Sequence, residues 1–402
     1  MKRAKATSRI LPSLIVVCFL FTAVGHAQSI PHKVQVALEK YASLDPISID
    51  WEGVLTMNAG RRSDEFSVTS SYSREGQSFS WMHEVKGKSA AYPYPRFKRI
   101  CRFDGNVLAE ANGRVQALWY TIPKLIAGQT RSSHFFAVPY FDAVGVYCPT
   151  RVTELPKGFL QSNILYLLQN GGKLVSCEET RLEQDAVVRI EIIAQNPTWD
   201  DFLRDCDITM KHERARLENK EISQKEFDEI VKTGENSKKA APQTLRWVYY
   251  LSPKSGYAVC KHERLALDGR VVVSYSNGNF QAIPGTQVVL AGRVKISSFE
   301  QWIGSHRYEI LSAPGCTRDW SVVKVSTKSI PKERFVLNMK EVVPGAEVID
   351  IVTPGLRRKD GTLITFKMPA SPDDLDATIA AATRKSRQTT MPIVGTSPKR
   401  QQ

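Results

Sequence analysis

The chain has 402 residues, with 55 Lys and Arg against 41 Asp and Glu, which gives a formal net charge of +14. Much of this excess lies at the two ends, with four basic residues in the first nine positions and five in the last twenty. The body is therefore only mildly basic, which disfavours a dedicated nucleic-acid groove and fits attraction to an anionic envelope surface. The length allows one large domain or two ordinary ones.

The first residues are typical of a secretory signal. The basic start is followed by the apolar run Leu14–Val24 and by Gly25-His26-Ala27, where small residues suit cleavage near Ala27. The run is shorter than the ~20 residues that a membrane-crossing helix needs. We therefore expect residues 1–27 to be removed and the protein to be exported to the periplasm or beyond. No later segment predicts a membrane span.

Strand signals dominate after a short first helix. Apolar spacing predicts a helix over residues 32–43, and a period of two predicts a strand over 64–72. Three further strands are expected between residues 97 and 121, separated by turns at 104–106 and 112–113. Turn signals at this spacing favour an antiparallel meander over βαβ units.

A helix over residues 159–170, ended by Gly171-Gly172, is expected to lead into two strands. Residues 198–243 are dense in charge and predict a largely helical insertion, with a capping box at Ser223–Glu226 and a helix end at Gly234. The late strand pattern resumes after it, with a turn expected at Asn277-Gly278. We thus expect one domain over 28–382 and a disordered basic tail over 383–402.

Six cysteines follow the expected signal: Cys101, Cys148, Cys177, Cys206, Cys260 and Cys316. An even number in an oxidising compartment permits three disulfides, and buried free thiols are the alternative. No CxxC pair is present, so a redox site is not expected.

The tetrapeptide KHER occurs twice, at Lys211–Arg214 and Lys261–Arg264, and neither copy continues into HExxH. One copy falls in the expected helical insertion and the other in an expected strand, so we interpret the repeat as coincidence. The chain also has no GxSxG elbow, phosphate-cradling glycine loop or metal-spaced Cys/His cluster. We therefore expect no enzyme activity, cofactor or metal, and no nucleic-acid partner.

Large apolar and aromatic side chains stand out on the expected strands. They include Trp51, Trp320 and Phe335 together with the six residues that we predict to line a cavity: Phe66, Val68, Tyr72, Trp119, Trp247 and Tyr249. Such residues are ordinarily core residues on the covered face of a sheet. A strongly curved antiparallel sheet with helices on its concave side can also leave a cavity that suits an apolar ligand.

The order of elements and several short motifs carry a family resemblance. The motifs are the turn Phe103-Asp104-Gly105 and the late segments Tyr249–Tyr257, Ile330–Phe335 and Val343–Val348. In these features the chain resembles the periplasmic lipoprotein-carrier and lipoprotein-receptor (LolA/LolB-like) superfamily. The resemblance implies an incomplete β-barrel wrapped around helices, with an apolar cavity that shelters lipoprotein acyl chains in the carriers. The chain is longer than the compact carriers.

The expected fold is α+β and mainly antiparallel β, with a curved half-barrel sheet wrapping one or more helices. The leading functional hypothesis is an exported, non-enzymatic protein that binds a lipid or lipoprotein acyl chain in the half-barrel. One alternative is an envelope interaction module with a filled core, whose insertion and basic surface contact a protein partner. Another is a hydrolase whose active site is assembled from distant residues.

Overall fold

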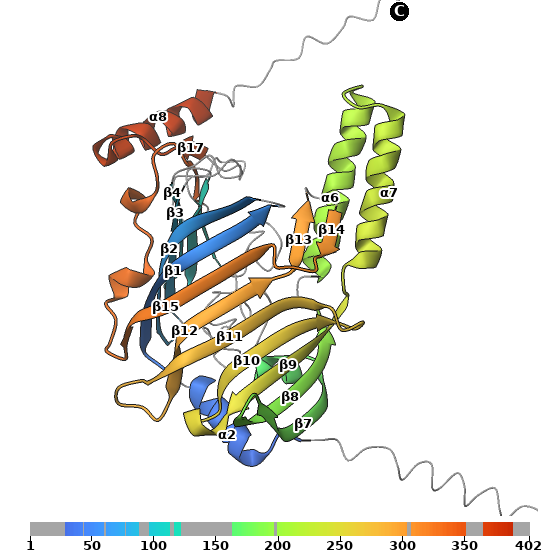
Figure 1. Ribbon diagram of the computed structural model, residues 1–402. Helices are drawn as coiled ribbons and strands as arrows, with labels where there is room; N and C mark the ends of the chain where they lie inside the picture. The colour runs from blue at the N-terminus through green and yellow to red at the C-terminus, as the bar shows by residue number, and fades with distance from the viewer. Residues whose placement is uncertain are drawn as a thin grey trace, which may run out of the picture.

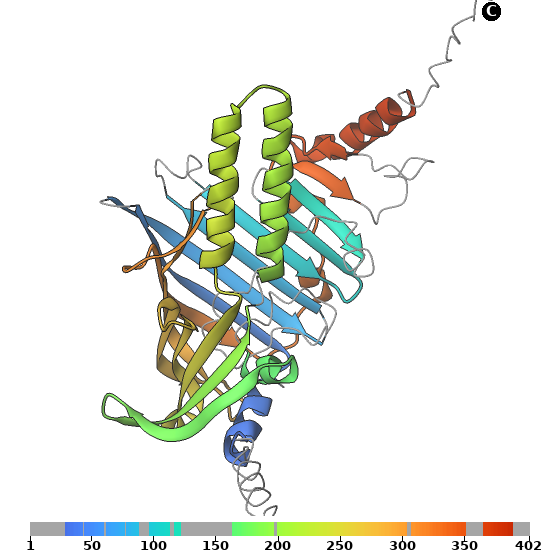
Figure 2. The ribbon, with the colours of Figure 1, turned by 90° about the vertical axis from the view of Figure 1, so that its right-hand side faces the viewer.

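A computed structural model of the chain, shown in Figures 1 and 2, describes residues 29–42, 44–59, 62–76, 78–87, 96–112, 116–121, 163–196, 199–303, 307–350 and 365–388. Within these residues the fold is α+β and mainly antiparallel β, built on one large, curved and unclosed sheet. The predicted fold class is confirmed.

The large sheet has fifteen strands in the order β17-β16-β6-β5-β4-β3-β2-β1-β15-β12-β11-β10-β9-β8-β7. One half is a meander of β1 (Ile47–Ala59), β2 (Arg62–Glu75), β3 (Ser78–Lys86), β4 (Arg96–Phe103), β5 (Val107–Asn112) and β6 (Gln116–Thr121). The other half comprises β7 (Lys173–Leu182), β8 (Asp185–Gln195), β9 (Thr244–Ser252), β10 (Ala258–Ala266), β11 (Val271–Ala282), β12 (Val289–Ser298) and β15 (Cys316–Ser326). Antiparallel pairing of β1 with β15 joins the two halves.

Alternation along β2 gives the sheet two faces. Phe66, Val68 and Tyr72 are buried, whereas Ser67 and Thr69 between them are exposed. This period of two is what a strand with one covered face requires, and it confirms the predicted strand while extending it at both ends.

The inner face is the side of the sheet against which two helices pack. Helix α2 (His32–Ala42) contributes Val34, Leu38 and Tyr41 to the main core, and α5 (Ile164–Gln169) contributes Ile164 and Leu167. Figure 2 shows both helices at one end of the curved sheet. The predicted first helix is confirmed, and α5 covers the described part of the predicted second one.

The C-terminal part of the chain covers the outer face of the first half and adds two strands to the edge of the sheet. This part contains two 3-10 helices (Lys332–Phe335 and Met339–Glu341), β16 (Glu347–Asp350), β17 (Thr365–Lys367), a 3-10 helix (Pro372–Asp374) and α8 (Leu375–Gln388). Its residues Leu337, Val342 and Val348 form a second core with Ile100 and Ala109 of the sheet. β16 pairs with β6 in parallel, unlike the other neighbouring pairs of the described sheet.

The charged insertion is a helical hairpin of α6 (Trp199–Glu218) and α7 (Gln224–Ala240), which projects beyond the sheet (Figure 2). It lies against a small second sheet of β13 (Glu300–Ile303) and β14 (Arg307–Ile310), where the backbone N–H of Tyr308 donates to Ser237 Oγ at 3.1 Å. The predicted capping box at Ser223 and Glu226 is present.

The helix end predicted at Gly234 is wrong, because α7 continues to Ala240. Gly234 is buried at the contact with α6, where a Cβ would lie 3.8 Å from Met210 Cε. A glycine costs a helix interior only about 1 kcal/mol, which hydrogen bonds and packing on both sides offset.

The turn predicted at Asn277-Gly278 is also wrong, because β11 runs through both residues. Asn277 pairs with Val294 and Gly278 with Arg293 on β12, and the Asn277 side chain donates to the Val259 carbonyl at 2.9 Å. These long-range hydrogen bonds override the local turn preference.

Two further expectations need correction near the C-terminus. Phe335 lies in a 3-10 helix and not in a strand. The predicted disordered tail starts too early, because α8 extends to Gln388 and Thr383 Oγ1 donates to the Ile379 carbonyl within it. Ile379 and Ala382 pack on the second core, which accounts for the helix continuing past residue 382.

Five of the six cysteines lie in the described part of the chain, and no disulfide joins any two of them there: Cys101, Cys177, Cys206, Cys260 and Cys316. Burial raises the pKa of the Cys101 thiol, which makes it an inert core residue. Cys148 lies outside the described residues. None of the helices in the described ranges is long and apolar enough to cross a membrane.

Candidate ligand-binding site on the inner face

Five of the six predicted cavity residues are buried on the sheet. Phe66, Val68 and Tyr72 lie on β2, and Trp247 and Tyr249 lie on β9, with exposed fractions between 0% and 3%. Four of them, all except Phe66, are members of the main core. The strand curvature thus brings the inner faces of two distant strands into one apolar cluster.

Phe66 stands apart from this cluster. Phe66 lies beside Gly87, where a Cβ would come within 2.6 Å of Phe66 Cδ1. Trp119 is opposite Ala109 in the pairing of β6 with β5, and its side chain lies outside the described residues.

The second KHER segment places two polar side chains on the same inner face. The imidazole of His262 is fully buried between Tyr249 and Tyr275, with ring centroids 5.0 and 3.9 Å away. Two residues along the strand, the Arg264 guanidinium lies over the rings of Trp247 at 4.7 Å and Tyr275 at 5.4 Å. Cation–π contacts of this kind attract a guanidinium to the face of an aromatic ring.

A matching aromatic group lies on the first half of the sheet and on the adjoining strand β15. Trp51 on β1 and Trp320 on β15 lie on neighbouring strands with ring centroids 6.5 Å apart, and Trp320 is opposite Gly53. His83 stacks on Trp81 at 5.8 Å and meets Trp320 edge-on at 6.4 Å. Tryptophan and histidine therefore line the inner face in both halves.

Several polar atoms in this interior lack hydrogen-bond partners. Within the described residues, neither ring nitrogen of His262 has a partner, and the indole N–H groups of Trp247 and Trp320 have none either. Burial lowers the pKa of His262 well below its ordinary value, with a smaller contribution from Arg264, so the ring is neutral at pH 7. Each buried orphan group costs about 1–3 kcal/mol.

The inner face also contains a serine–histidine contact. Ser70 Oγ lies 2.6 Å from His83 Nδ1, the distance expected of a nucleophile and its base. Burial first, and then the cations Arg318 and Arg99, lower the pKa of His83 to about 4. A catalytic serine needs a histidine that takes up its proton, and a neighbouring carboxylate normally stabilises the charged imidazolium that results. Beside His83 the neighbouring charges are cations, which destabilise that imidazolium. The arrangement therefore disfavours hydrolysis at this contact.

An ion pair adjoins this group. The Arg99 guanidinium donates to the Glu110 carboxylate, and both side chains are about nine-tenths buried. The Glu110 carboxylate is therefore the counter-ion of Arg99. Within the described ranges, no group of three or more His, Cys, Asp or Glu is placed to hold a metal ion.

Sequence reasoning missed His262 and Arg264 as residues of the inner face. Their signal was the alternation along β10, where His262 and Arg264 fall on one side and Lys261 and Glu263 on the other. Polar residues at the covered positions of a strand are the informative exception in such a pattern. Trp51 and Trp320 were recognised as strand aromatics but were not assigned to the cavity.

Comparisons with known proteins give structural similarity only. No protein-family model matches the chain, and no curated protein matches its sequence. Similar solved structures include a LolA superfamily protein from Nitrosomonas europaea, with 11% identity over 76% of this chain and 97% of that one, at a TM-score of 0.35.

Two further structures are similar at the same level. An outer membrane lipoprotein-sorting protein domain from Vibrio parahaemolyticus shows 7% identity over 75% of this chain and 94% of that one, at a TM-score of 0.36. A DUF1329 family protein from Desulfovibrio piger shows 10% identity over 74% and 93%, at a TM-score of 0.36. The chain is similar to these solved structures, one of which is a LolA superfamily protein.

Proposed function

We propose that the protein binds an acyl chain, of a lipid or a lipoprotein, between the inner face of the half-barrel and helices α2 and α5. The observation that carries this proposal is a fully buried aromatic interior in which His262, Trp247 and Trp320 have polar atoms without partners among the described residues. An optimised structural core satisfies or excludes such groups.

The chemistry of these groups indicates what they would bind. Trp247 and Trp320 each offer an N–H donor, and neutral His262 offers one donor and one acceptor. The carbonyl oxygens of an ester- or amide-linked acyl chain accept hydrogen bonds, while its methylene groups pack on aromatic rings. Burying each methylene contributes about 0.8 kcal/mol.

Access to this site requires inner-face contacts to open. Helix α5 has only six residues, and an isolated helix of that length is unstable without its packing. Its contribution rests on Ile164 and Leu167, which are buried in the main core. An acyl chain would replace these apolar contacts with similar ones, so α5 is the element that we expect to move.

Fluorescence titration tests the proposal. The purified full chain is titrated with a fluorescent acyl-chain probe, using the interior tryptophans as energy donors. Saturable transfer that a Trp247→Phe substitution reduces supports the proposal. A probe that fails to bind argues for a filled core. So does a probe that binds the Trp247→Phe and Ile164→Asp variants as tightly as it binds the unmodified protein.

The helical hairpin supports a second candidate function, contact with an envelope protein. The hairpin projects beyond the sheet (Figure 2). Its surface is rich in charge of both signs, including the exposed residues Glu221, Glu229 and Lys232. Crosslinking with and without residues 198–243 tests this function. Loss of a crosslinked partner, with probe binding retained, would identify the hairpin as the docking element.

We further propose that the protein is exported and acts without catalysis. The apolar run after the basic N-terminus supports export, and the cations beside His83 support the absence of serine hydrolysis. N-terminal sequencing of the protein recovered from its native envelope tests cleavage near Ala27. An N-terminus at Met1 would contradict it.

A further inference from the structure

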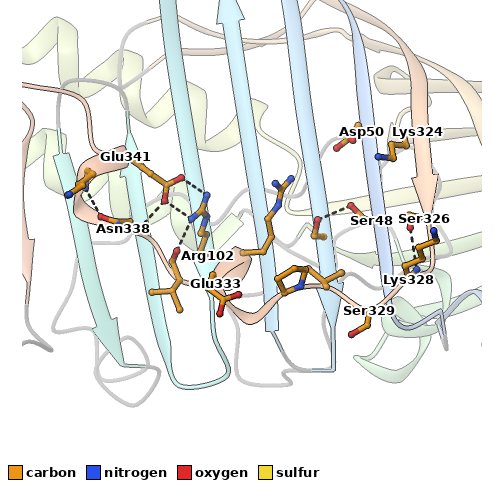
Figure 3. A pocket seen from close by; sticks show the side chains of 16 residues that line it. Ser48, Asp50, Arg102, Lys324, Ser326, Lys328, Ser329, Glu333, Asn338 and Glu341 are labelled. Atoms are coloured by element: carbon orange, nitrogen blue, oxygen red, sulfur yellow. Dashed lines mark hydrogen bonds and ion pairs between the residues drawn. The ribbon is translucent and has the colours of Figure 1, made fainter. Parts of the chain in front are cut away.

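A groove of about 720 Å³ lies on the outer face of the sheet, away from the acyl-chain site. Its floor is formed by β1, β2 and β15, and its wall by the segment 328–341 that crosses them (Figure 3). This volume is typical of small-molecule sites.

The floor of the groove contains a row of hydroxyl groups. Ser48 Oγ lies 2.9 Å from Ser73 Oγ on β2, and Ser48 is paired with Ser326 on β15. Two residues further along β1, Asp50 is paired with Lys324 on β15. Serine hydroxyls rotate to donate to whatever acceptor is present, so this row is a set of adjustable donors.

The wall is tied to the sheet at both ends of the groove. Arg102 donates to both oxygens of Glu341 at 2.6 and 2.7 Å and to the Val336 carbonyl at 2.7 Å. At the other end, the Glu75 carboxylate accepts from Ser329 Oγ and the Ile330 N–H, both at 2.9 Å. The groove is therefore held open by fixed contacts and is not a gap beneath a loose loop.

The remaining charges of the lining are mainly positive. Once Arg102 and Glu341 are paired, the lining has four cations, Lys324, Lys328, Arg334 and Lys340, against the two carboxylates Asp50 and Glu333. Within the described residues, none of these four cations forms an ion pair. An excess of cations around hydroxyl donors in a concave site attracts an anion.

We propose that this groove binds a phosphate group carried by a larger molecule. The tetrahedral oxygens of a phosphate can contact lysines of the floor and the wall and the serine row at the same time. Because the cations of the lining outnumber its two carboxylates, a group with more than one negative charge is attracted more strongly than a singly charged carboxylate. The groove is larger than phosphate alone requires, which leaves room for the rest of the molecule. The same chemistry occurs on a phospholipid headgroup and on a soluble phosphate ester.

Calorimetric titration of the full chain with pyrophosphate tests this site. The double variant Lys324→Gln/Lys328→Gln should bind pyrophosphate about ten-fold more weakly, because charge-assisted contacts are lost. The control is Lys232→Gln/Lys239→Gln, which removes the same charge from exposed positions on α7 and should leave affinity within about two-fold. No saturable binding, or equal weakening in both double variants, overturns the proposal.

Vesicles then distinguish the two sources of phosphate. Binding to phosphatidylglycerol vesicles that pyrophosphate competes away, and that the groove variant loses, identifies a membrane headgroup. Pyrophosphate binding without vesicle binding identifies a soluble phosphate ester. Vesicle binding that the groove variant retains counts against the site. All variants are also titrated with the acyl-chain probe, which should bind unchanged because the groove and the inner face are on opposite sides of the sheet.

Discussion

The imidazole of His262 lies 3.9 Å from the ring of Tyr275, centroid to centroid, fully buried and with no hydrogen-bond partner for either nitrogen among the described residues. A polar ring in this position lowers stability when the interior is closed. We interpret it as a group that gains its partner when a ligand with a carbonyl oxygen enters. A substitution of His262 should therefore change both the stability of the ligand-free protein and its affinity for the ligand.

Replacing His262 with Phe separates these two effects. We expect the free energy of unfolding to stay level or rise by about 1 kcal/mol, because an orphan polar ring is removed. Affinity for the acyl-chain probe should fall several-fold. Urea unfolding measures the stability, and titration with the probe measures the affinity.

The control is His212→Phe, at the exposed histidine of the other KHER copy, which should leave probe affinity unchanged. If His262→Phe loses stability but keeps its affinity for the probe, His262 has a structural role only.

Stability should decrease as pH falls from about 6.5 towards 4. The folded-state pKa of His83 is lowered to about 4, so the unfolded chain binds a proton in this window that the folded chain does not. His262 acts in the same direction. Urea unfolding at several pH values should show a loss of about 1–3 kcal/mol, and His83→Gln should flatten the slope. An identical slope in the variant would contradict this assignment.

Two strand glycines should respond in opposite ways to alanine. A Cβ at Gly53 would lie 2.0 Å from the Asp319 carbonyl oxygen and 2.6 Å from Trp320 Cδ1, so β1 and β15 could not keep their spacing. Gly53→Ala should cost more than about 3 kcal/mol. Gly278 has open space around its Cβ position, and Gly278→Ala should be neutral or stabilising by up to about 1 kcal/mol. Comparable urea midpoints for the two variants would show that the close approach of β15 to Gly53 does not limit which residue β1 can hold there.

The attachment of the segment 328–341 to the sheet should depend on one partly buried arginine. The side chain of Arg102 is 12% exposed and joins β4 to Glu341, whereas Arg293, 58% exposed, makes a similar pair with Asp319. Arg102→Gln should cost about 2–3 kcal/mol because a partly buried, two-pronged ion pair and a contact with a backbone carbonyl are lost. Arg293→Gln should cost less than about 1 kcal/mol. Proteolysis near residue 336 should also increase in the first variant alone.

Local patterns predicted those elements whose signal lies in a short stretch of sequence. The alternation of Phe66, Val68 and Tyr72 predicted β2, and the capping box at Ser223 predicted the start of α7. Both depend on neighbours within a few residues, where the chemistry of the chain is decisive.

Other features depend on contacts between distant segments. Asn277-Gly278 has strong turn character, yet pairing with β12 keeps it in a strand. The alternation along β10 indicates which residues share a face with His262, but its position between Tyr249 and Tyr275 follows from the register of β10 with β9 and β11. For the same reason the segment 328–341 gave no sign that it would form the wall of a groove.

Native mass spectrometry of the full chain, purified from its own envelope without added lipid, tests the acyl-chain site most directly. The site on the inner face predicts a ligand-bound species whose added mass, after extraction, corresponds to a molecule with one or more acyl chains, and whose abundance falls in His262→Phe. A single ligand-free species in both proteins would contradict it and identify the interior as a filled core.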